Sequence, residues 1–292
     1  MEVAITIDDL PENGLLPPNV TRPIIASKII HTLKKHHLQG VYGFLNAQPL
    51  EKNPEEIDIL YQWVNSGQYL GNHGYSHLDL ATTNPDEYIA DIKKNEPLLS
   101  QLMTNQNFYY YRYPFLAEGE TEEKRTAVRD YLSANNYQIA HVTVDFFEYE
   151  WNSPYVRCLN QDNKKAIEWL RKNYIIQAEN ALIIGEALSQ MLYQREIKHI
   201  LLIHINAFTA EMLDELLTTY ENHGVKFISL EDALNDEAYR LNPNVIATRS
   251  YTFLNQVRLS RKMKNPKIVQ ELYDSFPEEK LSDLCIKPKA LK

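Results

Sequence analysis

Short apolar runs alternate along the chain with longer stretches in which apolar residues recur at helical spacing. This alternation is typical of a parallel β-sheet covered by helices. The pattern predicts about seven β/α steps. The expected strands are residues 3–7, 40–45, 69–72, 108–113, 138–144, 199–205 and 225–228. The expected helices are residues 23–35, 54–65, 85–103, 120–134, 163–172, 178–193 and 210–223.

The alternation stops after about Leu234. The remaining residues, 235–292, are rich in basic side chains and interrupted by prolines. We therefore expect an α/β barrel over residues 1–234 and an irregular C-terminal extension over 235–292, either packed on the barrel or trailing from it.

Composition and charge narrow the class of protein. Hydrophobic residues make up 44% of the 292 residues, with only 9 Gly and 14 Pro, which excludes collagen-like and mainly disordered chains. The net charge of −9 argues against nucleic acid or an anionic membrane surface as a partner. The pattern gives no indication of an oligomeric state.

Targeting signals and cysteines give further expectations. No window has the 18 apolar residues of a membrane span, and no signal-peptide pattern opens the chain. As written, the sequence predicts a cytoplasmic protein, or a periplasmic or secreted one if a leader has been removed. Cys158 and Cys285 are too few and too far apart for a disulfide framework, and we expect buried thiols.

Two acidic and two histidine side chains follow the first and third predicted strands. Asp8 and Asp9 end the first, and His73 and His77 come four residues apart after the third. In a β/α fold these positions lie at the same edge, where catalytic groups gather. The spacing resembles that of zinc-protease helices, but Gly74 stands where a protease needs Glu.

Two His and one Asp form an ordinary three-ligand set for a divalent cation, with a position open for water. Zinc suits these ligands best, and cobalt, nickel, manganese or iron can substitute. The other Asp would remain free as a general base.

Three more predicted strands end in residues of catalytic type at the same edge. Arg112 ends the fourth strand, Asp145 and Glu148 follow the fifth, and His204 ends the sixth. Each alone is more typical of a packed or surface side chain. Five strands ending in metal-binding or acid/base residues at one edge indicate a catalytic site.

In these motifs the chain resembles the NodB-homology polysaccharide deacetylases, carbohydrate esterase family 4, over about residues 3–232. The resemblance implies a distorted (β/α)7 barrel that uses a bound metal to remove acetyl groups from N-acetylated or O-acetylated sugars. It implies Asp8 as the catalytic base and Asp9, His73 and His77 as metal ligands. Gly74 replaces the Ser or Thr of the family's histidine motif.

The resemblance also assigns roles in the later motifs. Arg112 would orient the base, the backbone N–H of Phe115 would bind the oxyanion, and His204 would be the general acid. The partner of that acid is left open between Asp145 and Glu148, the latter standing with Tyr149 where the family has Asp and Trp. The expected substrate-binding residues are Tyr113, Pro114, Phe115, Tyr149, Trp151 and Leu202.

The sequence therefore predicts a metal-dependent N-deacetylase of an amino sugar or polysaccharide, such as peptidoglycan or chitooligosaccharide. One alternative is a hydrolase of cyclic amides, similar to allantoinase, which a mostly apolar, enclosed pocket would favour. The other is a non-catalytic carbohydrate-binding relative, which the altered second and fourth motifs suggest. The presence of both Asp8 and His204 argues against the last alternative.

Overall fold

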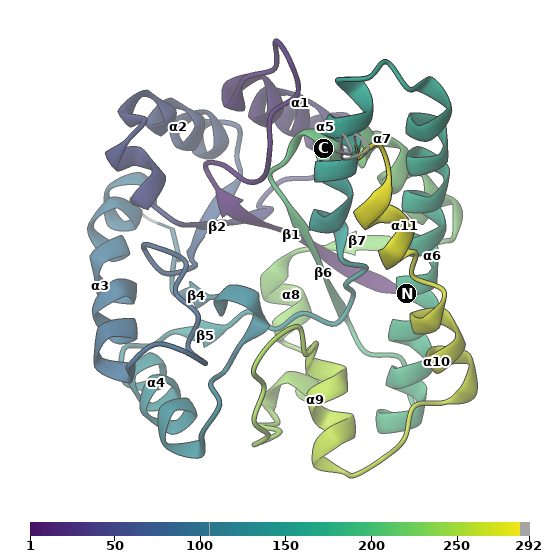
Figure 1. Cartoon of the computed structure of the whole chain (residues 1–292). Helices are drawn as coiled ribbons and strands as arrows, with labels where there is room; N and C mark the ends of the chain where they lie inside the picture. The colour runs from purple at the N-terminus through teal and green to yellow at the C-terminus, as the bar shows by residue number, and fades with distance from the viewer. Residues whose placement is uncertain (105, 287–292) are drawn as a thin grey trace, which may run out of the picture.

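The fold is a curled parallel sheet surrounded by helices, seen in a computed structural model that describes residues 1–104 and 106–286 (Figure 1). The strands are β1 Glu2–Leu10, β2 Tyr42–Leu45, β3 Tyr69–Asn72, β4 Tyr110–Tyr111, β5 Gln138–Ile139, β6 His199–His204 and β7 Lys226–Ile228. They are ordered β5-β4-β3-β2-β1-β6, and β7 pairs with the first residues of β1. The predicted seven-step α/β architecture is confirmed.

The sheet closes through the residues that follow β5. The Thr143 and Val144 N–H groups both donate to the Ile200 carbonyl at 3.0 Å, and Leu202 N–H donates to the Val144 carbonyl at 3.1 Å. A parallel bridge joins Val144 to Leu201. The predicted strand 138–144 thus pairs with β4 at its start and with β6 at its end, which makes the sheet a distorted barrel.

Helices follow the strands, and α5 and α8 are additional to the helices that the sequence predicts. Their bounds are α1 Arg22–Lys35, α2 Ile57–Asn65, α3 Pro85–Leu102, α4 Glu122–Ala134, α5 Asn152–Leu159, α6 Lys164–Tyr193, α7 Ala207–Asn222 and α8 Leu230–Leu234. Short 3₁₀ helices include η3 Pro114–Leu116 and η4 Glu148–Trp151. The two helices predicted over 163–172 and 178–193 form the single helix α6, because residues 173–177 between them stay helical.

Successive residues of β1 face opposite sides of the sheet. Val3, Ile5 and Ile7 lie in the large core cluster shared with the surrounding helices. Ala4 packs in the smaller cluster on the other side. Asp8 lies on the same face of β1 as Ala4, so the Asp8 carboxylate points to the interior of the barrel.

The C-terminal extension is more regular than the sequence predicts. It contains α9 Phe253–Ser260, α10 Lys267–Asp274 and α11 Glu278–Asp283. Figure 1 shows α10 and α11 running along α6. Apolar residues of α9 and α10 share a buried cluster with one end of α6. Within the described residues, no helix combines the length and apolarity needed to cross a membrane.

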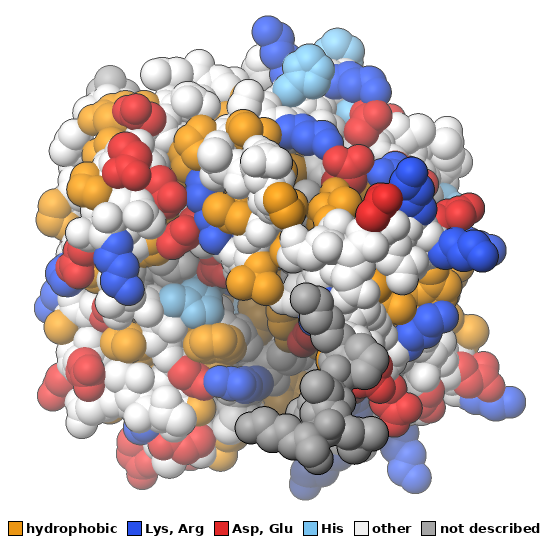
Figure 2. All heavy atoms as spheres, turned by 45° about the horizontal axis from the view of Figure 1, so that its top comes forward, with side chains coloured by type: hydrophobic (Ala, Val, Ile, Leu, Met, Phe, Trp, Pro, Cys, Tyr) orange, Lys and Arg blue, Asp and Glu red, His pale blue; other side chains and the backbone are white. Residues whose placement is uncertain are grey.

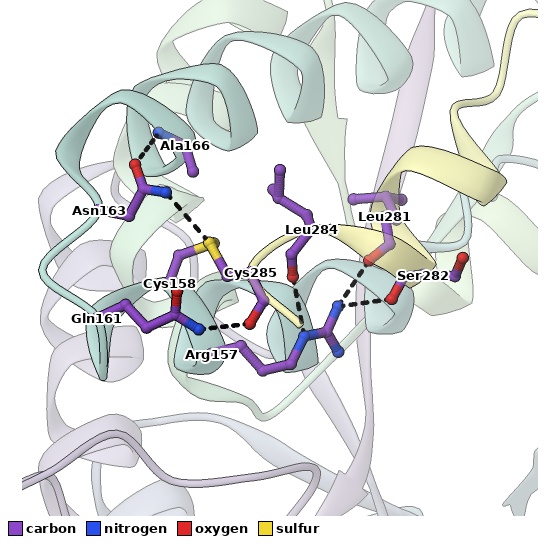
Figure 3. The surroundings of a disulfide bond; sticks show 9 residues. All are labelled: Arg157, Cys158, Gln161, Asn163, Ala166, Leu281, Ser282, Leu284 and Cys285. Carbon is purple, nitrogen blue, oxygen red and sulfur yellow. Dashed lines mark hydrogen bonds between the residues drawn. A yellow bond between two sulfur atoms is a disulfide. The ribbon is translucent and has the colours of Figure 1, made fainter. Parts of the chain in front are cut away.

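The expectation of two free thiols is wrong. Cys158 and Cys285 form a disulfide with their Cα atoms 5.2 Å apart, although 127 residues separate them in sequence. The Arg157 guanidinium donates to the carbonyls of Leu281, Ser282 and Leu284, and thus holds the end of the extension beside α5 (Figure 3). Because α11 folds back onto α5, two distant cysteines meet, and their spacing gives no sign of this contact.

Candidate active site

Both carboxylates at the end of β1 face one cavity. Neighbours on a regular strand point to opposite faces, but Asp9 has a left-handed backbone (φ 66°) and the pairing of β1 with β2 shifts between Ile7 and Leu10. This irregularity has the character of a β-bulge, which often redirects a side chain beside an active site. Asp8 and Asp9 both line the cavity as a result.

Arg112 holds Asp8 in place. Its Nη1 donates to both carboxylate oxygens of Asp8, at 3.0 and 3.1 Å. The same guanidinium donates to the Thr6 hydroxyl at 3.0 Å and to the Ala140 carbonyl at 2.6 Å. Both members of the ion pair are almost fully buried, and four bonds fix the arginine. Arg112 lies behind the cavity wall and orients the carboxylate.

Asp9, His73 and His77 bring one donor atom each to a common point, all within 4.8 Å of one another. The Asp9 Oδ1 atom lies 3.3 Å from Nε2 of each histidine. It is buried and has no hydrogen-bond partner, while the other oxygen accepts from Asn13 at 2.7 Å.

The protons on the histidines fit a cation site. His73 Nδ1 lies 2.7 Å from the Arg112 carbonyl, which can only accept, so Nδ1 carries a proton and Nε2 is the atom that offers a lone pair in the neutral ring. Burial lowers the pKa of His77, against the attraction of Asp9, and favours its neutral form. Burial raises the pKa of Asp9, but His77 and His73 hold it well below its ordinary range. One carboxylate and two imidazole lone pairs facing each other suit a divalent cation such as zinc.

The loop that carries the two histidines is anchored by Asp91, a residue that the sequence does not single out. Its carboxylate accepts from the N–H groups of Tyr75 and Ser76 and from the Ser76 hydroxyl. A Cβ atom at Gly74 would lie 2.8 Å from Asp91 Oδ2, and Gly74 has φ 73°. The close carboxylate and the positive φ both favour glycine at this position.

His204 is paired with Glu148. One Glu148 oxygen accepts from the His204 backbone N–H at 2.8 Å and lies 3.0 Å from ring Nδ1. The other oxygen accepts from Asn206 at 2.8 Å and from the Thr209 hydroxyl. Burial lowers the pKa of His204, but the Glu148 bond and the charge of Asp9 outweigh it and raise the pKa to about 9.

Asp145 has a different position. It lines the cavity, and its carboxylate accepts from the Phe147 N–H at 2.9 Å. Burial raises its pKa. Of the two acids left open by the sequence, Glu148 is therefore the one bonded to His204.

The cavity has a volume of about 520 Å³. Figure 2 shows one face of the molecule hollowed near its centre, with acidic, basic, histidine and hydrophobic side chains around the hollow. Ten of the predicted site residues line the cavity: Asp8, Asp9, His73, His77, Tyr113, Phe115, Asp145, Tyr149, Leu202 and His204. Five other residues also line it: Asn13, Leu116, Glu150, Arg249 and Ser250.

Two predicted substrate-binding residues do not reach the cavity. Trp151 is fully buried, stacked on Trp169 and packed against Tyr174, so its ring belongs to the core. Pro114 is buried at the start of η3. The sequence pattern could not identify Arg249 and Ser250 as site residues, because both lie beyond the last predicted β/α step.

Comparisons with known proteins find polysaccharide deacetylases among the proteins similar to this chain. Residues 1–140 match the family model described as polysaccharide deacetylase. A peptidoglycan-N-acetylglucosamine deacetylase of Bacillus cereus is 38% identical over 101 residues, 35% of this chain and 32% of that protein. The peptidoglycan-N-acetylmuramic acid deacetylase PdaA of Bacillus subtilis is 23% identical over 82% of this chain and 73% of its own length. The match thus spans about a third of the B. cereus relative and most of PdaA.

Solved structures share the fold. A polysaccharide deacetylase from Bacillus cereus superposes on 78% of this chain and 91% of its own, with a TM-score of 0.54 and 16% identity. A pseudoenzyme of the CE4 family from Bacillus anthracis superposes on 80% of this chain and 65% of its own, with a TM-score of 0.53 and 19% identity. Residues 1–140 thus match the polysaccharide deacetylase family, and the chain shares its fold with solved structures that include a CE4 family member.

Proposed function

We propose that the protein is a metal-dependent hydrolase that removes acetyl groups from the nitrogen of N-acetylated sugars. One observation carries this proposal: Asp8, His204 and the Asp9–His73–His77 cluster all line one cavity. Its relatives are named for deacetylation of peptidoglycan and of chitin, which supports an N-acetylated polysaccharide as the substrate.

Asp9, His73 and His77 would hold zinc, or cobalt, nickel, manganese or iron in its place. When bound, the cation polarises the amide carbonyl and lowers the pKa of water. Asp8 then accepts the proton that water loses as its oxygen bonds to the acyl carbon. The Arg112 ion pair keeps the Asp8 carboxylate aimed into the cavity.

Phe115 and His204, which also line the cavity, have the remaining roles in the reaction. The Phe115 backbone N–H donates to the oxyanion that forms at the acyl carbon. His204, kept protonated by Glu148, gives its proton to the leaving nitrogen as the C–N bond breaks. The products are acetate and a free amine on the sugar.

The cavity lining supports a sugar as the substrate. Tyr149 and Phe115 are each about 40% exposed and line the cavity, so aromatic surface is available there for a sugar ring. Most lining residues are polar or charged. A mostly apolar, enclosed pocket would instead have favoured a cyclic-amide hydrolase.

Acetate release from N-acetylglucosamine oligomers tests the proposal. We expect release by the zinc-loaded protein, its loss with EDTA, and its return when zinc is added. Asp8→Asn should lower kcat by about 10²–10⁴-fold, the usual contribution of a general base, while the bound zinc measured by metal analysis stays unchanged.

Asp86→Asn is the matched control, because Asp86 is exposed in the first turn of α3. It should leave kcat unchanged. Acetate release that persists in EDTA, or in Asp8→Asn at the wild-type rate, contradicts the proposed function.

A further inference from the structure

The cavity contains one basic residue whose role the proposed reaction leaves open. Among the described residues that line it, Arg249 is the only Lys or Arg, whereas Asp8, Asp9, Asp145 and Glu150 are acidic. Arg249 comes from the C-terminal extension and lies outside residues 1–140, which match the family model.

Backbone hydrogen bonds fix the segment that carries Arg249. The Glu118 N–H donates to the Ala247 carbonyl at 2.7 Å, and the Ser250 N–H donates to the Phe115 carbonyl at 2.8 Å. The Phe253 N–H donates to the Val142 carbonyl at 2.7 Å. Residues 247–253 are therefore tied to the loops after β4 and β5, and Arg249 has a defined position at the cavity.

The Arg249 guanidinium is oriented by two neighbours. Its Nε and Nη2 donate to Asp79 Oδ2 at 3.2 and 3.1 Å, and its carbon lies 4.7 Å from the centre of the Phe115 ring. The second oxygen of Asp79 accepts from the Ala81 N–H. A guanidinium has five N–H groups, so three are left for a ligand, and 65% of the side chain is exposed.

The same Phe115 ring links Arg249 to the metal-ligand cluster. It packs edge-on against His77, with the ring centres 4.5 Å apart. One aromatic ring thus separates the guanidinium from a residue of the proposed metal site. An acid held by Arg249 would lie near the acetamido group, on the same sugar or on the next one.

The geometry points to Arg249 as a specificity-determining residue that binds an anionic substituent of the sugar substrate, a carboxylate or a phosphate. An oriented guanidinium matches both groups through paired N–H donors. It also offsets the repulsion that the four acidic lining residues exert on an anionic substrate. This inference rests on the proposed deacetylase function and names the class of substrate.

Three oligosaccharides of equal length test the inference: one neutral, made of N-acetylglucosamine, one with N-acetylmuramic acid residues, and one with 6-phosphorylated N-acetylglucosamine. The kcat/KM for acetate release is measured for each with the zinc-loaded protein. We expect a preference for one of the charged substrates, and the stronger response identifies carboxylate or phosphate. Arg249→Gln should lower that preference by about fivefold, the upper range for an exposed ion pair, chiefly through KM.

Two further variants serve as comparison and control. Arg249→Lys should keep part of the preference, because it keeps the charge but not the paired donors. Arg261→Gln is the matched control, since Arg261 also belongs to the extension and lies over the Tyr193 ring, away from the cavity. It should leave the preference unchanged.

A preference unaltered by Arg249→Gln overturns the inference. An equal loss on neutral and charged substrates also overturns it, because Arg249 would then act through Phe115 on the site itself. Binding of the same oligosaccharides to the metal-free protein, measured by calorimetry, separates the two proposals. Arg249-dependent binding of a charged oligosaccharide without any acetate release supports this inference and contradicts the proposed function.

Discussion

Glu148 joins the proposed general acid to the fold. Each of its two carboxylate oxygens accepts two hydrogen bonds: one oxygen from the backbone and ring of His204, the other from Asn206 and Thr209. Buried carboxylates need such partners, because an unpaired charge is costly away from water. The arrangement fixes the His204 ring and stabilises its protonated form at the same time.

The pH dependence of the reaction should therefore depend on Glu148. With the His204 pKa raised from 6.5 to about 9, its acid form persists above neutral pH, and the alkaline limb of kcat/KM should lie near or below pH 9. Glu148→Gln removes the charge, so burial lowers the pKa and the limb should move down by at least about one pH unit. The pH profile of acetate release measures this shift.

Asp145→Asn is the comparison for this prediction, because Asp145 lines the cavity and its carboxylate accepts from Phe147. It should shift the limb less than Glu148→Gln. A limb that stays in place in Glu148→Gln contradicts the assigned pair. The raised pKa also means that protonated His204 stabilises the fold fully below about pH 6.5, and that this contribution fades as pH rises through about 9.

Among the elements, β3, which leads directly to His73, packs closely against β2 and β4. An added Cβ at Gly71 would lie 2.6 and 2.9 Å from ring atoms of Phe44 on β2, and 3.0 Å from the Tyr110 carbonyl on β4. Real Cβ atoms essentially never approach neighbours at under 3.0 Å. Glycine at this position is thus required by the spacing of three adjacent strands.

Gly71→Ala should destabilise the protein by about 1–3 kcal/mol, the usual cost of overpacking a core. Urea unfolding of the variant measures this change. Phe44→Leu removes the nearest ring, so the double variant should lose less free energy than the sum of the single variants. An unchanged unfolding free energy in Gly71→Ala contradicts the tight packing of β3.

The elements that the sequence predicts well are those with a strong local pattern. Buried strands appear as apolar runs, and the catalytic residues follow them directly, so the cavity could be anticipated from His73, His77 and His204. The helices of the extension are eight residues or shorter. Helices this short depend on packing, here against α5 and α6, so the sequence alone does not show that they form.

At the scale of the whole molecule, the extension completes the lining of the cavity. Packing of α9 and α10 on α6 places residues 247–253 over the loops after β4 and β5. Arg249 and Ser250 thereby reach a cavity whose other residues come from the first 204 positions. This contact joins segments far apart in sequence, so neither spacing nor periodicity could predict it.

The disulfide is the second link between the extension and the barrel. Closing a loop of about 127 residues removes conformational entropy from the unfolded chain. Cys158→Ser with Cys285→Ser should therefore lower the free energy of unfolding by about 2–5 kcal/mol, measured with denaturant. A reducing agent should destabilise the native protein similarly and leave the double variant unchanged.

Acetate release should respond differently from stability. The buried contacts of Phe253, Leu254, Val257 and Val269 with α6 do not depend on the disulfide, so residues 247–253 should stay at the cavity when the bond is broken. We expect the double variant to keep the wild-type kcat and KM well below its unfolding temperature. Loss of activity without loss of stability would show instead that Cys285 holds the cavity wall in place. An unchanged free energy of unfolding in the double variant would contradict the bond between Cys158 and Cys285.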